Sequence, residues 1–336
     1  ENHANMDLLS QKIVWVDVPV EVRSAKLSKL QCLSFDALDY QPDDLLCFVE
    51  LVMQHTGCAD RCAIPPGRLR AWATAAKWKY RDNPFHNWFH GFSVFQMCYY
   101  QLWVSPLRDL FSALDVFGLL IASLCHDLDH PGFTNNYMVD SQSELALIHN
   151  DIAVLENHHA SLACELLRRD ATAIGSGLDA AAQKALRRVV IKCILDTDMA
   201  KHSESCQKLS GAGATEDRQL MLGACIHSSD LSAQVLPWKT AQKWEERISM
   251  EFTRQARKEV AAGRSPAPFM SFHPDDVKQR GKLQRDFFDF VLFPLWDPYT
   301  QQLPALRPCY RNLVKNRSFY EHRWNTGEDP DPKWCK

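Results

Sequence analysis

The sequence lacks an excess of positive charge. Its 336 residues carry 38 Lys and Arg against 41 Asp and Glu, which gives a formal net charge of −3. Proteins that bind nucleic acids normally carry a basic excess, because much of their affinity comes from contacts with phosphates. We therefore expect no nucleic-acid partner.

Long apolar runs are also missing. A helix needs about 20 consecutive apolar residues to span a bilayer, whereas the densest stretch, residues 117–125, is short and leads into His and Asp. We predict a core helix there and no membrane-spanning segment. The sequence starts at Glu1 without a signal peptide, which suggests a piece excised from a longer chain. We expect a cytoplasmic location, with any membrane association supplied by a domain outside this sequence.

The cysteines lack the spacing that a disulfide framework or a zinc finger requires. Twelve cysteines are scattered along the chain, and only Cys58 and Cys62 lie close together. No second pair completes a zinc-finger spacing. We predict buried free thiols in a reducing compartment.

Alternating strand patterns, internal repeats and low-complexity linkers are absent, and helical spacing dominates instead. Apolar residues recur at three- and four-residue steps within residues 114–124, 186–195, 220–226 and 244–252. Pro and Gly breaks are spread evenly. We predict one compact all-α domain over residues 1–336, with its core at about 70–300. The polar stretch from Arg317 onward is expected to wrap the surface or fray.

Histidines and carboxylates gather at the ends of these predicted helices. Pro84 is suited to starting a helix that would carry His86 and His90 on one face, although such a pair alone is weak evidence. The apolar helix up to Cys125 is followed at once by two histidines and two carboxylates, at His126, Asp127, Asp129 and His130. Burying ionisable groups without partners costs several kcal/mol, so partners or metal ions are expected there.

Three further segments extend this pattern. Glu156 lies in a Leu-Glu-Asn-His-His block, Thr197 and Asp198 lie in a Thr-Asp-Met block, and Asp230 follows a helix predicted from about Asp217. Mixed His and Asp ligands with oxygen-rich neighbours suit Zn²⁺ in one site and Mg²⁺ or Mn²⁺ in another.

Taken in order, these blocks resemble the catalytic domain of class I cyclic nucleotide phosphodiesterases, from Tyr80 to about Trp296. In detail the sequence is similar to kinetoplastid members of that family. The resemblance implies an all-α fold whose helices converge on a two-metal site of the HD type. It implies hydrolysis of cAMP, cGMP or both to the 5′-monophosphate.

The resemblance also assigns roles to residues. His90, His126, Asp127 and Asp230 would hold the first metal, usually zinc, and Asp127 would bridge to the second, usually magnesium. A hydroxide between the metals would attack the phosphate, while His86 would protonate the leaving ribose oxygen. The residues expected to orient ligands and metal-bound waters are His130, Glu156, Asp129, Thr197 and Asp198.

At the purine end, the resemblance implies that Gln284 bonds the base edge, Phe287 stacks on the ring and Ile248 faces it. The family commonly has Asn or Asp three residues after the last metal-binding Asp, whereas this chain has Ala233. A glutamine amide that can flip would then accept either purine, so we expect dual specificity. Residues 266–279 correspond to a variable loop beside the pocket.

Two other functions stay open from the sequence. One is a different HD-type metal phosphohydrolase that acts on nucleoside mono- or triphosphates, although no cluster of Arg and Lys lies near the motifs to bind a triphosphate. The other is a catalytically silent relative that only binds cyclic nucleotides, which would require loss of a ligand or of the acid. A purely structural helical protein is the plainest alternative. The oligomeric state stays open.

Overall fold

The structure, a computed structural model, describes residues 26–273, 275–331 and 333–334. The boundaries predicted at residues 1 and 336 lie outside this part of the chain. Its regular elements are all helices, with no strand among the described residues, which confirms the all-α prediction. Within the same residues, no helix is both long and apolar enough to cross a membrane. The described cysteines are free and most are buried, as predicted.

The helices of the first half are α3 (Ser28–Leu30), η3 (Ala37–Asp39), α4 (Pro42–His55), α5 (Cys58–Arg61), α6 (Arg68–Lys79), α7 (Trp88–Val104), α8 (Leu107–Leu110), α9 (Ala113–Cys125), α10 (Asn135–Asp140), α11 (Glu144–Ile148) and α12 (Val154–Arg168). Those of the second half are α13 (Ala180–Leu195), η4 (Met199–Lys201), α14 (His202–Leu209), η5 (Ala214–Glu216), α15 (Arg218–Asp230), η6 (Leu231–Val235), α16 (Trp238–Ala261), η7 (Pro268–Met270), α17 (Val277–Phe287), the π-helical turn η8 (Phe288–Leu292), α18 (Phe293–Gln302), η9 (Pro304–Leu306) and α19 (Arg307–Thr326).

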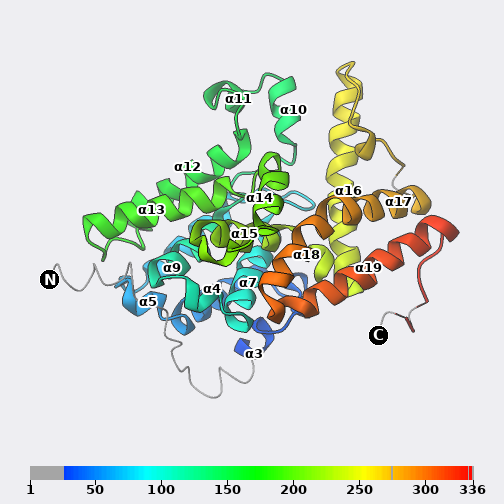
Figure 1. The fold of residues 1–336 in the computed structure, drawn as a ribbon. Helices are drawn as coiled ribbons and strands as arrows, with labels where there is room; N and C mark the ends of the chain where they lie inside the picture. Colours follow the sequence, from blue (N-terminus) through cyan, green and yellow to red (C-terminus); the bar gives the residue numbers. More distant parts are fainter. Residues whose placement is uncertain (1–25, 274, 332, 335–336) are drawn as a thin grey trace.

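Helix α9 lies at the centre of the packing, against α7, α12 and α13 (Figure 1). Its start is fixed by a capping box, in which Ser112 accepts from the backbone N–H of Asp115 and the Asp115 carboxylate accepts from that of Ser112. All thirteen of its residues are buried. Gly118 permits the close approach of α13, because a Cβ there would lie 2.5 Å from Val189 Cγ1. The helix ends at His126, so it carries that residue and Asp127 into the interior.

A second group of helices stands beside this centre, with α16 upright next to α17, α18 and α19 (Figure 1). The fully buried carboxylate of Glu245 on α16 accepts a hydrogen bond of 3.0 Å from Arg280 Nε on α17 and is also paired with Arg280 Nη2. A charged pair at this depth is favourable only with good geometry, which the two-point contact supplies. The pair therefore joins α17 to α16.

The end of the chain departs from the sequence-based prediction. Residues 317–326 do not wrap the surface or fray, because α19 continues to Thr326 and packs on α17, whereas the described residues beyond Thr326 are non-helical and most are exposed. The approach is close at Gly281, where a Cβ would lie 2.6 Å from the Trp324 backbone nitrogen. The buried face of α19 includes Asn316 and Arg323. Arg323 belongs to the polar stretch that was predicted to lie at the surface, and its burial shows why polarity alone concealed this helix.

Candidate metal centre and active site

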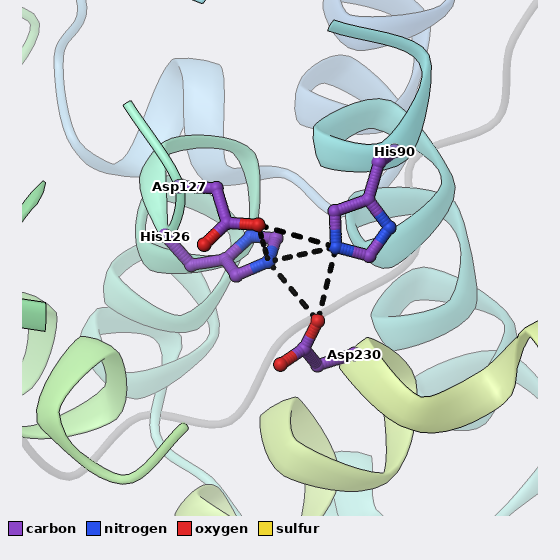
Figure 2. Close-up of side chains that lie close together, drawn as sticks. All are labelled: His90, His126, Asp127 and Asp230. Carbon is purple, nitrogen blue, oxygen red and sulfur yellow. Dashed lines mark hydrogen bonds and ion pairs between the residues drawn. The ribbon is translucent and has the colours of Figure 1, made fainter. Parts of the chain in front are cut away.

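Four side chains from three helix ends meet in the interior: His90, His126, Asp127 and Asp230 (Figure 2). His90 lies in the first turn of α7, whose start is capped by Asn87. His126 is the last cap residue of α9, and Asp127 follows it. Asp230 ends α15, a helix capped by Asp217 as the sequence predicted.

The ligand atoms of these residues are spaced as a small ion requires. His90 Nε2 lies 3.0 Å from Asp230 Oδ1, 3.2 Å from His126 Nε2 and 3.3 Å from Asp127 Oδ2. His126 Nε2 lies 3.2 Å from both carboxylate oxygens. A tetrahedral zinc ion with ligand distances of about 2.0–2.1 Å separates its ligands by about 3.3 Å. The cluster therefore has the dimensions of a divalent metal site.

The protonation pattern supports the same conclusion. His126 Nδ1 lies 2.9 Å from the carbonyl oxygen of Ser123, a partner that can only accept, so Nδ1 carries the proton and Nε2 offers a lone pair. Burial opposes a charge on His126, yet Asp127 and Asp230 raise its pKa well above the usual range, so the two carboxylates favour a positive charge at Nε2, either a proton or a bound metal ion. Ring nitrogens and carboxylates that converge in this way can hold a cation between them.

The other oxygen of Asp127 faces a second set of side chains. Asp127, His130 and His159 bring ligand atoms together, with Asp127 Oδ1 3.7 Å from His159 Nε2. His159 Nδ1 is bound to the carbonyl oxygen of Leu128 at 2.6 Å, which leaves a buried Nε2 lone pair without a hydrogen-bond partner. Burial, together with the nearby Asp198 and Asp127, raises the pKa of Glu156 to about 7. Such a group of acceptors fits a second cation beside Asp127.

His86 is not on a helix, which corrects the prediction. Pro84 does not start α7, because the helix begins at Trp88 and residues 81–87 are non-helical. The reason is Asn87, whose side chain accepts from the N–H groups of Phe89 and His90 and so sets the helix start at Trp88, four residues after Pro84. The His86 and His90 rings are still neighbours, with centroids 5.7 Å apart.

The backbone and ring of His86 are held by Glu251 of α16. Glu251 Oε1 accepts from the N–H groups of Phe85 and His86 at 2.7 and 2.8 Å, and Oε2 lies 2.6 Å from His86 Nδ1. Burial opposes a charge on His86, but Glu251, with smaller contributions from Asp127 and Asp230, raises its pKa to about 8. The ring is therefore cationic at neutral pH, with Nδ1 committed to Glu251.

His130 lies against the other face of this ring. The two rings are stacked at 3.9 Å between centroids and 17° between planes. His130 Nδ1 accepts from the N–H of Gly132 at 2.9 Å. Burial and the adjacent His86 hold the pKa of His130 well below its usual range, so the proton resides on His86.

The sequence matches a known family over the segments that build this site. Residues 85–313, about two-thirds of the chain, match the model of the 3′,5′-cyclic nucleotide phosphodiesterase family. The chain belongs to this family. This family is metal-dependent. The candidate metal site in this chain is the cluster of His90, His126, Asp127 and Asp230.

Individual relatives agree. The chain is 33% identical over 295 residues to the high affinity cGMP-specific 3′,5′-cyclic phosphodiesterase 9A of Mus musculus, covering 86% of this chain and 55% of that protein. It is 35% identical to the 3′,5′-cyclic-nucleotide phosphodiesterase regA of Dictyostelium discoideum, covering 85% of this chain and 37% of the relative. The 3′,5′-cyclic-AMP phosphodiesterase of Drosophila melanogaster, isoform F, is 32% identical, with 82% and 44% covered. The chain thus spans about half or less of these relatives.

A solved structure shows the same fold. The phosphodiesterase domain of Salpingoeca rosetta rhodopsin phosphodiesterase superposes with a TM-score of 0.85 at 30% identity, covering 91% of this chain and 94% of that one. The kinetoplastid likeness is not tested by these comparisons and stays a prediction.

The remaining residues predicted to orient metal ligands and metal-bound waters have hydrogen-bond partners of their own. Asp129 faces Arg81 and His158, at 2.6 and 2.8 Å, so it has partners outside the cluster. Glu156 is bound by Asn135 through both oxygens. The Thr197 hydroxyl donates to the carbonyl oxygen of Ile194, and Asp198 caps η4 by accepting from the N–H of Ala200. Their roles toward metal-bound water stay predictions.

The predicted base-binding residues lie on α16 and α17. Gln284 is half-buried one turn from the end of α17, and Phe287 ends that helix and packs against the core. Ile248 is half-buried on α16, one turn before Glu251. No hydrogen bond joins the Gln284 amide to another described residue. These positions are compatible with the predicted roles.

The loop predicted beside the pocket lines a separate cleft. A space of about 560 Å³ lies between α16 and residues 266–279, lined by Thr253, Ala256, Val260 and Met270 among others. On a helix with 3.6 residues per turn, these α16 positions lie on the side roughly opposite Glu251. The cleft is therefore distinct from the metal cluster.

Sequence reasoning missed Glu251, Asn83 and His159 as members of the site. Glu251 is 2% exposed, although it lies among charged residues on an amphipathic helix. Its position three residues after Ile248 places it on the same helical face, which is a signal that could have been used. Asn83 lies directly before Pro84, and no local pattern marks it as a site residue.

Proposed function

We propose that this chain hydrolyses 3′,5′-cyclic nucleotides, both cAMP and cGMP, to 5′-monophosphates at two divalent metal ions. The observation that carries the proposal is the convergence of His90, His126, Asp127 and Asp230, with a cationic His86 held beside them by Glu251. Family membership supports the reaction class.

The metal ligands divide into two groups around Asp127. His90, His126, Asp230 and Asp127 Oδ2 would hold Zn²⁺, and Asp127 Oδ1 beside His159 and His130 would face Mg²⁺ or Mn²⁺. When bound, the ions lower the pKa of water toward neutrality and neutralise charge on the phosphoryl oxygens. The protein fixes the two carboxylate oxygens of Asp127 in different directions, so one side chain serves both sites.

His86 would protonate the leaving group. Its Nδ1 faces Glu251, which leaves Nε2 to give a proton to the ribose 3′ oxygen as the phosphorus–oxygen bond breaks. Water supplies the new oxygen on phosphorus, and the products are a 3′-hydroxyl and a 5′-monophosphate. The stacked His130 has a depressed pKa and would therefore not compete as the acid.

The surroundings of the Gln284 amide, which would contact the purine base, support dual specificity. Ala233 offers no hydrogen bond to the purine, and no described side chain holds the Gln284 amide in one orientation. An amide free to rotate can present either its donor or its acceptor to the base. The named relatives include a cGMP-specific and a cAMP enzyme, so the family alone does not decide the preference.

The deciding experiment combines elemental analysis with hydrolysis assays. We expect near-stoichiometric zinc after dialysis, turnover of cAMP and cGMP, and loss of turnover with chelator that added metal reverses. Metal without turnover, but with cyclic nucleotide binding, would identify a silent relative. Turnover of a nucleoside triphosphate instead would identify a different phosphohydrolase.

The preference is measured by kcat/KM for the two nucleotides. Similar values of kcat/KM for cAMP and cGMP support the proposal that the Gln284 amide can rotate to accept either base. A hundredfold preference for either nucleotide contradicts dual specificity, and leaves the metal chemistry unaffected.

A further inference from the structure

The segment that carries His86 has no helical hydrogen bonds of its own to hold it. Residues 81–87 are non-helical, and α7 begins only at Trp88. A proton donor on such a segment needs side-chain contacts to keep its position, because a misplacement of about 1 Å can cost about 100-fold in rate. Glu251 supplies contacts on one side.

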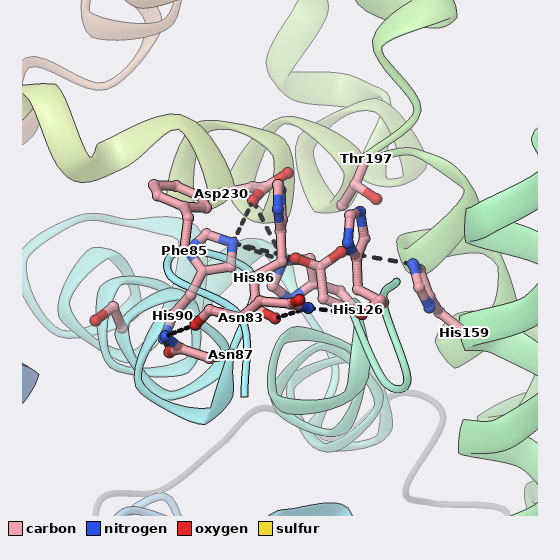
Figure 3. A network of polar contacts seen from close by, with 12 residues as sticks. Asn83, Phe85, His86, Asn87, His90, His126, His159, Thr197 and Asp230 are labelled. Carbon is pink, nitrogen blue, oxygen red and sulfur yellow. Dashed lines mark hydrogen bonds and ion pairs between the residues drawn. The ribbon is translucent and has the colours of Figure 1, made fainter. Parts of the chain in front are cut away.

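Asn83 supplies the contacts on the other side. Its side-chain Nδ2 donates to the carbonyl oxygen of His86 at 3.0 Å and to that of His130 at 2.7 Å. The side chain is buried, with 6% of the residue exposed. One amide group thus joins two segments that are 47 residues apart, and these segments carry the His86 and His130 rings, which stack at 3.9 Å. Figure 3 shows Asn83 beside His86.

The Asn83 amide is itself oriented by Arg254. Arg254 Nη2 donates to Asn83 Oδ1 at 3.0 Å, so the oxygen faces the guanidinium and the nitrogen faces the two carbonyls. Arg254 follows Glu251 by three residues on α16, and the two side chains therefore project from one face of that helix. Helix α16 holds the His86 segment at three points: through Glu251, through Arg247 Nη1, which donates to the carbonyl oxygen of Pro84 at 3.0 Å, and through Arg254 and Asn83.

Only an amide satisfies this arrangement. The two carbonyls need N–H donors, which a carboxylate at position 83 does not have, and the guanidinium needs an acceptor. An Asp of the same shape would leave both carbonyls without a donor in a buried place, at a cost of about 1–3 kcal/mol. The chemistry of the site therefore selects Asn.

We propose that Asn83, oriented by Arg254, is a positioning residue that sets the proton donor His86 against the leaving 3′ oxygen. This inference rests on the proposed function, and it concerns only the proton-transfer step. In that step the phosphorus–O3′ bond breaks, its electron pair goes to O3′, and the His86 Nε2 proton joins that oxygen. Asn83 touches neither the substrate nor the metals in this scheme.

The test compares two substrates that differ in their need for an acid. One is the natural cyclic nucleotide, and the other is its analogue with sulfur in place of the 3′ bridging oxygen. A thiolate leaves without protonation near neutral pH, since thiols have pKa values of about 8.5. Asn83→Ala and Asn83→Asp should lower kcat for the oxygen substrate by about 10- to 100-fold. For the sulfur analogue we expect a change within about threefold, and KM should change little for either.

The matched control is Asn316→Ala. Asn316 is also buried and its Nδ2 also bridges two backbone carbonyls, those of Gln234 and Leu236, at 2.9 and 2.8 Å. Its loss should lower the thermal midpoint to a similar extent without changing the ratio of the two activities. If Asn83→Ala fails to fold, Arg254→Met tests the same idea, because it releases the amide orientation while Asn83 stays. Arg254→Met should shift the ratio of the activities on the two substrates in the same direction, by a smaller factor.

Equal loss on both substrates, or no loss on either, overturns the inference. A wild-type chain that hydrolyses neither nucleotide would instead refute the proposed function. Wild-type turnover with an unchanged substrate ratio in both variants would refute only the role of Asn83.

Discussion

Replacing Glu251 with Gln removes the negative charge that faces His86 Nδ1 and keeps the shape of the side chain. The amide oxygen can still accept from the N–H groups of Phe85 and His86, at the places where Oε1 now lies 2.7 and 2.8 Å away. The amide NH₂ then faces Nδ1 and donates to it. This contact favours the neutral ring, with its one proton on Nε2, over the cation.

The size of the effect follows from two contributions. With a pKa of about 8, His86 is protonated in about 90% of molecules at pH 7, whereas at the ordinary pKa of about 6.5 the fraction is about one quarter. Protonation alone thus predicts about a fourfold loss of turnover at pH 7. If only the cationic ring can act as the acid, the loss of turnover is larger, up to the full contribution of general acid catalysis, about 10²–10⁴-fold.

The assay is the pH dependence of kcat for cyclic nucleotide hydrolysis. The active form of His86 is protonated, so activity is present below its pKa and is lost as pH rises through it. Because Glu251→Gln lowers that pKa, the alkaline limb should move to lower pH. The matched control is Glu259→Gln, the same change at a buried position two turns further along α16, bonded to Gln255. An unmoved limb with full activity in Glu251→Gln would refute the reasoning.

Three further substitutions, one of them with a control variant, test the metal site and the fold. Asp230→Asn should reduce bound zinc well below one ion per chain in elemental analysis and abolish turnover, and retained turnover would contradict its assignment as a ligand. Glu245→Ala leaves the Arg280 guanidinium without its buried carboxylate and should lower the free energy of unfolding in urea by about 3–5 kcal/mol. Asp286→Ala, which removes a partly exposed pair on α17, should cost about 1 kcal/mol or less, and equal losses would argue against a structural role for the buried pair. Gly118→Val should force α9 from α13 and cost about 1–3 kcal/mol in thermal unfolding, whereas an unchanged midpoint would show that the approach is not tight.

The sequence was informative where chemistry and helix pattern coincide. His126 and Asp127 could be predicted because an uninterrupted apolar helix leads directly to them, and α9 ends there. Asp230 depended on the resemblance to the family, because its local context alone says little, although a helix starting at about Asp217 was predicted and α15 begins there. Local pattern therefore accounts for His126 and Asp127, but not for Asp230.

Contacts between distant segments could not be predicted in this way. His86 was expected on a helix because Pro84 is acceptable at a first turn, but the Asn87 cap moved the start. Glu251 contacts a residue 165 positions away, and its local surroundings resemble an exposed charged helix. The buried Arg323 of α19 is paired with Asp329 and lies over aromatic rings, so a charged residue forms part of an interior face.

The arrangement of His90 and Asp230 also has a consequence for stability. These residues are 140 positions apart, and they approach within 3.0 Å only in the folded chain. An ion held between them acts as a cross-link that the unfolded chain does not possess, and binding energy becomes folding energy. At free metal 100 times the dissociation constant, this linkage contributes about 2.7 kcal/mol. Metal ions bound for catalysis would thus also hold α7 against α15, and their removal would destabilise the helices that form the active site.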